Sequence, residues 1–140
     1  MAATFPLDIV TPERTVLSES VASLQVPAID GSLGILAGHA PLLAGLGVGT
    51  CVVRTAAGAT EALAIAGGFV QVSRERVTVL ADTAEFAAEI DPDRAEAALA
   101  RARDMLSQVE ATGGSRQEVT EAIRRAQTRL RVARGGSDIG

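Results

Sequence analysis

Apolar residues follow two different patterns along this chain, and the change falls near residue 90. From Phe5 to Leu80 they form short, valine-rich runs that are interrupted by polar residues, glycine and proline. Alternation with a period of two is typical of half-buried β-strands, and frequent turn residues between such runs are typical of a sandwich or barrel. We therefore expect eight to ten short strands over residues 1–86, folded as a β-sandwich or flattened barrel.

Turn residues divide these expected strands. Asp30-Gly31, flanked by apolar residues, predicts a tight reversal of the chain. Gly67-Gly68 is expected to end a strand over 63–66 before another strand begins at Phe69. The apolar positions over 16–26 predict one or two further strands.

After residue 90 the apolar positions recur at helical spacing, on two stripes rich in alanine. Asp91 followed by Pro92 predicts a helix start, with the aspartate as N-cap and the proline at the first helical position. Ser115, with Glu118 three residues later, predicts a second start through a capping box. The expected helices cover about 91–110 and 116–134.

The two helices predict an antiparallel hairpin that forms a C-terminal domain over residues 87–140. The fold class is therefore α+β, mainly β. Because alanine buries little apolar area, we expect the hairpin to pack only weakly on itself and on the β domain.

The composition of the chain excludes several classes of function. One histidine, one cysteine and no tyrosine or tryptophan leave little with which to build an ordinary active site, and no cluster of residues has metal-ligand spacing. His39 is expected to have a structural or interface role. The acidic net charge of −4 and the 2% aromatic content argue against nucleic acid as a partner. No apolar stretch has the length of a membrane span, so association with a membrane would have to occur through a partner.

Arginine is the only basic residue type apart from the single histidine, and it is concentrated near the C-terminus. Residues 115–140 contain six arginines and three acidic residues, which predicts an acidic or phosphate-bearing partner. Antiparallel packing would bring Arg94 and Arg101 near Arg125 and Arg129. Either an anion lies between these guanidinium groups, or they form a solvated basic face; the residues alone favour the second alternative.

Five segments together resemble the epsilon subunit of F-type ATP synthase. They are residues 7–12, 30–43, 67–72, 77–82 and 130–133, and they follow the family's order along nearly the whole chain. The chain departs from the family at Ala37, where proline is usual, and at Ser32, where glutamate is common. The resemblance implies a β-sandwich followed by a helical hairpin, in agreement with the patterns above.

The resemblance also implies a non-catalytic rotor subunit that couples proton flow to ATP synthesis. Such a subunit binds the gamma subunit and the ring of c subunits, on the cytoplasmic side of the cell membrane, as a peripheral part of the complex. The rotor interface implied in this chain comprises Asp30, Gly31, Ser32, His39, Pro41 and Leu42. In this family the hairpin also extends into the catalytic head and blocks ATP hydrolysis by contacting the alpha and beta subunits. The implied inhibitory basic face comprises Arg124, Arg125, Arg129, Arg131 and Arg134.

Some bacterial members of the family bind ATP on the folded hairpin without magnesium, through the motif Ile/Leu-Asp-x-x-Arg-Ala. The motif is present here, and the resemblance implies an ATP site made of Glu85, Ile90, Asp91, Arg94, Ala95, Arg101, Arg125 and Arg129. ATP would then be a regulatory ligand, with no cofactor required and no metal bound. The alternative is a constitutive coupling and inhibitory module that binds no nucleotide.

Overall fold

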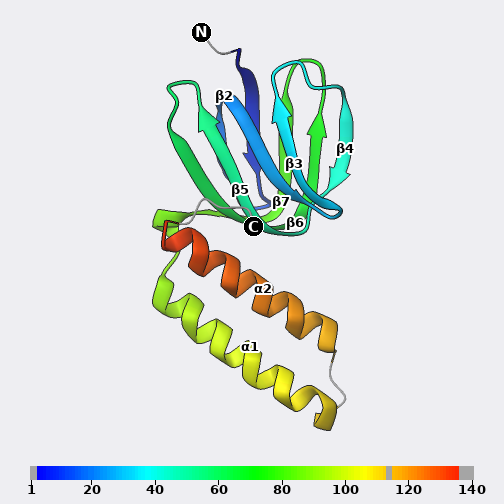
Figure 1. The fold of residues 1–140 in the computed structure, drawn as a ribbon, viewed down its shortest axis with the longest axis vertical. Helices are drawn as coiled ribbons and strands as arrows, with labels where there is room; N and C mark the ends of the chain where they lie inside the picture. The colour runs from blue at the N-terminus through cyan, green and yellow to red at the C-terminus, as the bar shows by residue number, and fades with distance from the viewer. Residues whose placement is uncertain (1–2, 113–114, 136–140) are drawn as a thin grey trace.

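The computed structural model describes residues 3–112 and 115–135, and it has a β-sandwich above a helical hairpin (Figure 1). The elements are β1 (Phe5–Val10), β2 (Thr15–Ala28), β3 (Gly31–Leu36), β4 (Leu42–Gly45), β5 (Val48–Thr55), β6 (Thr60–Val72), β7 (Val77–Phe86), the short 3₁₀ helix η1 (Ala87–Glu89), α1 (Pro92–Thr112) and α2 (Arg116–Ala133). The predicted fold class is confirmed.

The strands are hydrogen-bonded in the order β1-β7-β6-β5-β2-β3, with β4 on β6. β1 also pairs with β2, so the sheet closes on itself. β1 is antiparallel to β2 and parallel to β7. Alternate residues of the strands point inward and form one apolar core, in which Leu7, Ile9, Leu24 and Leu63 are almost completely buried.

The described residues contain seven strands, fewer than the eight to ten expected, because two strands are long. β2 has 14 residues and β6 has 13, and β6 continues through Gly67 and Gly68. Gly68 has φ +111°, and a Cβ atom there would lie 1.9 Å from the carbonyl oxygen of Leu80 on β7. Glycine at this position therefore permits close approach of two strands and does not end one.

Both helices begin where the sequence predicts. The Asp91 carboxylate accepts hydrogen bonds from the backbone N–H groups of Asp93 (3.0 Å) and Arg94 (3.4 Å), and the Ser115 hydroxyl accepts one from Glu118 N–H (3.3 Å). The bounds differ from the expected ones by two residues or fewer. Residues 113–114 of the predicted connection lie outside the described part of the chain.

The second helix, α2, lies between α1 and the sandwich (Figure 1). It packs over β5 and β6, where alternate alanines leave room for a helix to approach closely. A small apolar cluster, which we call the hinge cluster, joins the hairpin to the sandwich at the start of α1 and the end of α2. The hinge cluster consists of Ala64, Ile90, Ala95, Leu130 and Val132.

Within the described ranges, neither helix is long and apolar enough to cross a membrane.

Candidate functional site

A cavity of about 590 Å³ opens between the hairpin and the sandwich, and we call it the hairpin cavity. Its walls come from the β1–β2 turn, the end of β7, and facing positions on α1 and α2. The lining residues are Thr11, Glu13, Arg14, Thr83, Ala84, Glu85, Ala98, Ala122, Arg125, Ala126 and Arg129. Its volume falls within the range of about 300–1,000 Å³ that is typical of small-molecule sites.

Four of the residues that line the cavity are alanines, namely Ala84, Ala98, Ala122 and Ala126, and they come from three different elements. The lining also includes the charged residues Glu13, Arg14, Glu85, Arg125 and Arg129. The site therefore combines an apolar surface with charged groups of both signs.

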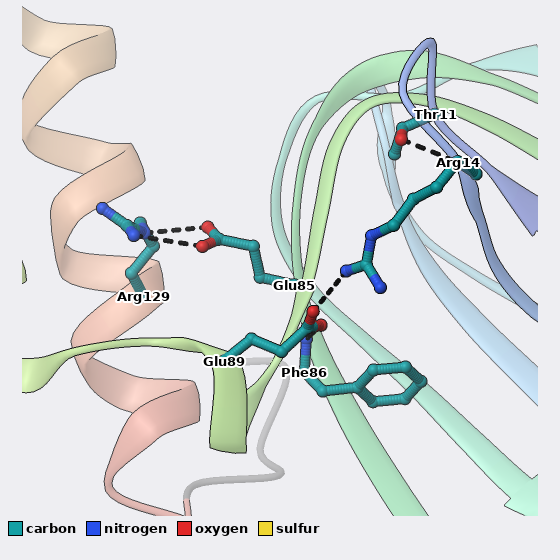
Figure 2. A network of polar contacts seen from close by, with 6 residues as sticks. All are labelled: Thr11, Arg14, Glu85, Phe86, Glu89 and Arg129. Atoms are coloured by element: carbon teal, nitrogen blue, oxygen red, sulfur yellow. Dashed lines mark hydrogen bonds and ion pairs between the residues drawn. The ribbon is translucent and has the colours of Figure 1, made fainter.

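An ion pair crosses the cavity wall between the sandwich and the hairpin. Arg129 Nε donates to Glu85 Oε1 at 2.8 Å, and Arg129 Nη2 donates to Glu85 Oε2 at 3.1 Å (Figure 2). Arg125, one helical turn earlier, is exposed and has no ion pair among the described residues, so the Glu121–Arg125 pair considered from sequence is not formed there. Of the two guanidinium groups that α2 contributes to the cavity, that of Arg129 is thus neutralised and that of Arg125 is available.

The predicted ATP-site residues on α1 and just before it are placed in two different ways. Arg94 and Arg101 are exposed, and they lie four residues before and three residues after Ala98, which lines the cavity. This spacing puts both arginines on the helix face that borders the cavity. Ile90 and Ala95, in contrast, are buried in the hinge cluster and do not line the cavity.

Asp91, between them, is exposed, and its carboxylate caps α1. The structure therefore brings Glu85, Arg125 and Arg129 together in the cavity. It places Arg94 and Arg101 at the border of the cavity.

A second polar network on the same wall was not predicted from the sequence. Arg14 Nη2 donates to Glu89 Oε2, and Glu89 Oε1 accepts from the Phe86 N–H at 3.0 Å (Figure 2). The Thr11 N–H and hydroxyl both donate to the Arg14 carbonyl, which closes the β1–β2 turn. The hydrogen bond from Arg14, followed by that from the Phe86 N–H, lowers the pKa of Glu89 below its usual value of 4.5. The network fastens η1 to the sandwich.

The six residues of the implied rotor interface fall into two groups. Asp30, Gly31 and Ser32 lie at the β2–β3 turn, on the edge of the sandwich that faces α2. His39, Pro41 and Leu42 lie beyond the other end of β3, where Leu42 pairs with Val72. Because β3 has six residues, the two groups are separated by about 20 Å.

His39 Nδ1 donates to the neighbouring Ala40 carbonyl at 2.7 Å. The structural or interface role expected of His39 stays a prediction.

The arginines of the implied basic face are distributed around α2. Arg124 and Arg131 line a smaller cavity of about 270 Å³ on the opposite flank from Arg125 and Arg129, against the turn that contains Gly31 and Ser32. Arg134 Nη2 donates to Glu96 Oε1 on α1 at 2.9 Å. In the docked hairpin, four of these five arginines therefore lie along the boundary with the sandwich and the fifth is paired within the hairpin.

Metal-binding side chains do not cluster in the described part of the chain. No group of three or more histidine, cysteine or acidic side chains there has the geometry to hold a metal ion. Cys51 is buried in the core, and burial raises the pKa of its thiol to about 12.

Comparisons with known proteins agree with this arrangement over both parts of the chain. Residues 4–87 match the family described as the beta-sandwich domain of the ATP synthase delta/epsilon chain, and residues 88–134 match the long alpha-helix domain of the same chain. The ATP synthase epsilon chain of Desulfitobacterium hafniense (strain Y51) is 44% identical over 135 residues, which are 96% of this chain and 99% of the relative. That of Solibacter usitatus is 45% identical over 134 residues, which are 95% of this chain and 98% of the relative.

Solved structures share the fold. A chain in the cryo-EM structure of the Euglena gracilis mitochondrial ATP synthase (OSCP/F1/c-ring) is 26% identical, with a TM-score of 0.78, and the match covers 91% of this chain and 80% of that one. A chain in the central stalk/c-ring structure of the Tetrahymena thermophila enzyme is 14% identical, with a TM-score of 0.57, over 95% and 96% of the two chains, and it shows the fold alone.

Proposed function

This chain belongs to the family of ATP synthase delta/epsilon chains, as a non-catalytic epsilon subunit of the central stalk, and we propose that ATP in the hairpin cavity holds its hairpin against the sandwich. The hairpin docked against the sandwich is the non-inhibitory state of the subunit. The released hairpin is the state that blocks ATP hydrolysis.

The observation that carries this proposal is the composition of the hairpin cavity. Glu85 comes from the sandwich, whereas Arg125 and Arg129 come from α2, and Arg94 and Arg101 border the same space on α1. Guanidinium groups bind phosphate oxygens through paired hydrogen bonds and supply the counter-charge that a magnesium ion otherwise provides. A ligand that contacts these residues binds the docked hairpin and not the released one.

The thermodynamic linkage between ligand binding and hairpin docking gives the size of the stabilisation. A ligand that binds only one state stabilises it by RT ln(1 + [L]/Kd), about 2.7 kcal/mol at a hundredfold excess over Kd. The described apolar contact between the hairpin and the sandwich is the small hinge cluster, in which Ala64 and Ala95 bury little apolar area, so packing there contributes only modestly to docking. Ligand binding of this size therefore suffices to change which state is populated.

The released state requires the arginines of α2 to be available. In the docked state Arg124, Arg125, Arg129 and Arg131 lie along the boundary with the sandwich. Release of the hairpin would remove them from that boundary and present them to acidic segments of the alpha and beta subunits, which is how we propose that hydrolysis is inhibited.

We further propose that the sandwich binds the gamma subunit and the c ring and couples proton flow to ATP synthesis. The subunit would then be peripheral, on the cytoplasmic side of the cell membrane, and held there by the complex. The two groups at the ends of β3 provide two separate contact surfaces, one at Asp30–Ser32 and one at His39–Leu42, of which only the first adjoins α2.

Calorimetric titration of the whole chain with ATP in the presence of EDTA tests the nucleotide site. We expect saturable heat for the wild type and affinity weakened about tenfold or more in Arg125→Gln, because one charge-assisted contact is lost. Arg103→Gln is the matched control, since Arg103 is an exposed arginine of α1 that does not line the cavity. A wild type that gives no heat at millimolar ATP would support the alternative, a constitutive module that binds no nucleotide.

A further inference from the structure

The hairpin cavity contains a third guanidinium group, which belongs neither to the hairpin nor to the ATP motif. Arg14 lies in the β1–β2 turn, lines the cavity together with Arg125 and Arg129, and is paired with Glu89. We propose that Arg14 is a further ligand-binding residue of this site, and that it exchanges Glu89 for the phosphates of the bound nucleotide. The inference rests on the proposed function, because it concerns the same cavity.

Because the Arg14–Glu89 pair is exposed to solvent, breaking it costs little free energy. The two side chains are 46% and 36% exposed. Ion pairs at this level of exposure change an equilibrium by about fivefold at most, since water already solvates both charges. The Glu85–Arg129 pair is less exposed and makes two hydrogen bonds, so it is the more persistent of the two.

The charges around the cavity also favour the exchange. Without a ligand, Arg129 forms an ion pair with Glu85, and Arg14 forms one with Glu89. Arg125 has no ion-pair partner among the described residues. A triphosphate without magnesium brings more negative charge than Arg125 can neutralise even together with Arg94 and Arg101 at the border of the cavity. Arg14 is the remaining cation among the lining residues of the cavity.

The hinge stays folded without the contact between Arg14 and Glu89 while the ligand is bound. Glu89 Oε1 accepts the Phe86 N–H at 3.0 Å, and this bond involves the other carboxylate oxygen from the one that Arg14 contacts (Figure 2). Ile90 also stays buried in the hinge cluster. Arg14 is therefore able to leave Glu89 without unfolding η1.

After the exchange, the ligand contacts both the sandwich and the hairpin. Arg14 is carried by the sandwich, and Arg125 and Arg129 are carried by α2. A nucleotide that contacts all three joins the two parts, so its binding energy acts on docking itself and not only on the pairing of α1 with α2.

Two variants of the same ion pair separate this role from a purely structural one. Arg14→Gln removes the cation, whereas Glu89→Gln removes the competing carboxylate but keeps an oxygen that accepts the Phe86 N–H. If the pair only braces the hinge, both variants break it and change ATP affinity in the same direction. If Arg14 exchanges partners, the two variants change the affinity in opposite directions.

Calorimetry on the full chain, with ATP in EDTA and separately with inorganic tripolyphosphate, measures the difference. We expect about fivefold weaker binding for Arg14→Gln, partial recovery in Arg14→Lys, and about two- to fivefold tighter binding for Glu89→Gln. Arg76→Gln is the control, because its pair with Asp8 (3.4 Å) is also exposed on the arginine side and neither residue lines the hairpin cavity.

Each outcome decides between the possibilities. Parallel changes in Arg14→Gln and Glu89→Gln, or no change in Arg14→Gln, overturn the inference while a loss of affinity in Arg125→Gln leaves the proposed ATP site standing. Binding of tripolyphosphate but not of ATP, with the opposite changes described above, supports the role of Arg14 and overturns the nucleotide function. A wild type that binds neither probe overturns both.

Discussion

Arg129 of α2 and Glu85 of β7 are 44 residues apart in the chain and are joined by two hydrogen bonds of 2.8 and 3.1 Å. Their side chains are only 33% and 29% exposed. The pair is a polar connection between the second helix and the sandwich, next to the apolar hinge cluster. It is made in the docked arrangement of the hairpin.

Removing one partner of this pair should weaken docking in the absence of nucleotide. We expect Glu85→Gln to lower the free energy of docking by about 1 kcal/mol, as for a partly exposed two-pronged ion pair, and hydrogen exchange of the α2 amides to become about fivefold faster. Arg134→Gln breaks the pair with Glu96 inside the hairpin, where both side chains are more than half exposed, and should leave exchange nearly unchanged. Equal effects of the two variants would contradict this assignment.

Stability should depend on pH through Glu89. Its pKa is lowered in the folded chain from 4.5, so the stabilisation by the Arg14–Glu89 pair is complete above pH 4.5 and is lost as the pH falls through the lowered value. The difference in melting temperature between wild type and Glu89→Gln should be constant from pH 7 to about pH 5 and close in stronger acid. A difference that grows on acidification would show that the sign is wrong.

Thr50 offers a stabilising substitution. Its hydroxyl oxygen is buried and has no hydrogen-bond partner among the described residues, on a strand that α2 covers. An unpaired buried hydroxyl costs about 1–3 kcal/mol, so Thr50→Val should raise the melting temperature by about 3 °C.

Thr55→Val is the opposite case, because the Thr55 hydroxyl accepts from Ala59 N–H at 3.1 Å. That variant should lower the melting temperature. If Thr50→Val is the more destabilising of the two, the Thr50 hydroxyl has a partner after all.

The alanines of the hairpin cavity should be as necessary for ATP binding as its charges. Ala122→Leu adds three carbon atoms to the cavity wall without altering any charge, and we expect at least tenfold weaker ATP binding with an unchanged circular dichroism spectrum. Ala97→Leu makes the same change on an exposed position of α1 outside the cavity and should bind ATP normally. Normal binding by Ala122→Leu would place the nucleotide elsewhere.

The helical half of the molecule could be predicted closely from the sequence because its signals are local. Asp91 and Ser115 cap the helices that follow them, within three residues along the chain. The prediction that a strand ends at Gly67-Gly68 is wrong, because only the register with β7 shows that Gly68 lies against the Leu80 carbonyl. The same limit applies to the cavity.

The residues at the cavity fall into two groups, those that the sequence could predict and those that it could not. Glu85, Arg125 and Arg129 could be proposed through the resemblance to the family, which substitutes for knowledge of the fold. Arg14 and Glu89 are 75 residues apart and belong to no motif, so no pattern in the sequence connects them. Only the closure of β1 on both β2 and β7 brings their elements together.

The distance between the sandwich and α2 tests the central claim most directly. Spin labels at Glu19→Cys on β2 and Gln117→Cys on α2 report that distance, and the native Cys51 stays unlabelled because its thiol is buried, with a pKa of about 12. The measurement is made in urea that releases about half of the hairpins. We predict that ATP in EDTA restores the docked distance in the wild type and fails to do so in Arg125→Gln. A distance distribution that stays the same when calorimetry shows ATP to be bound would contradict the account.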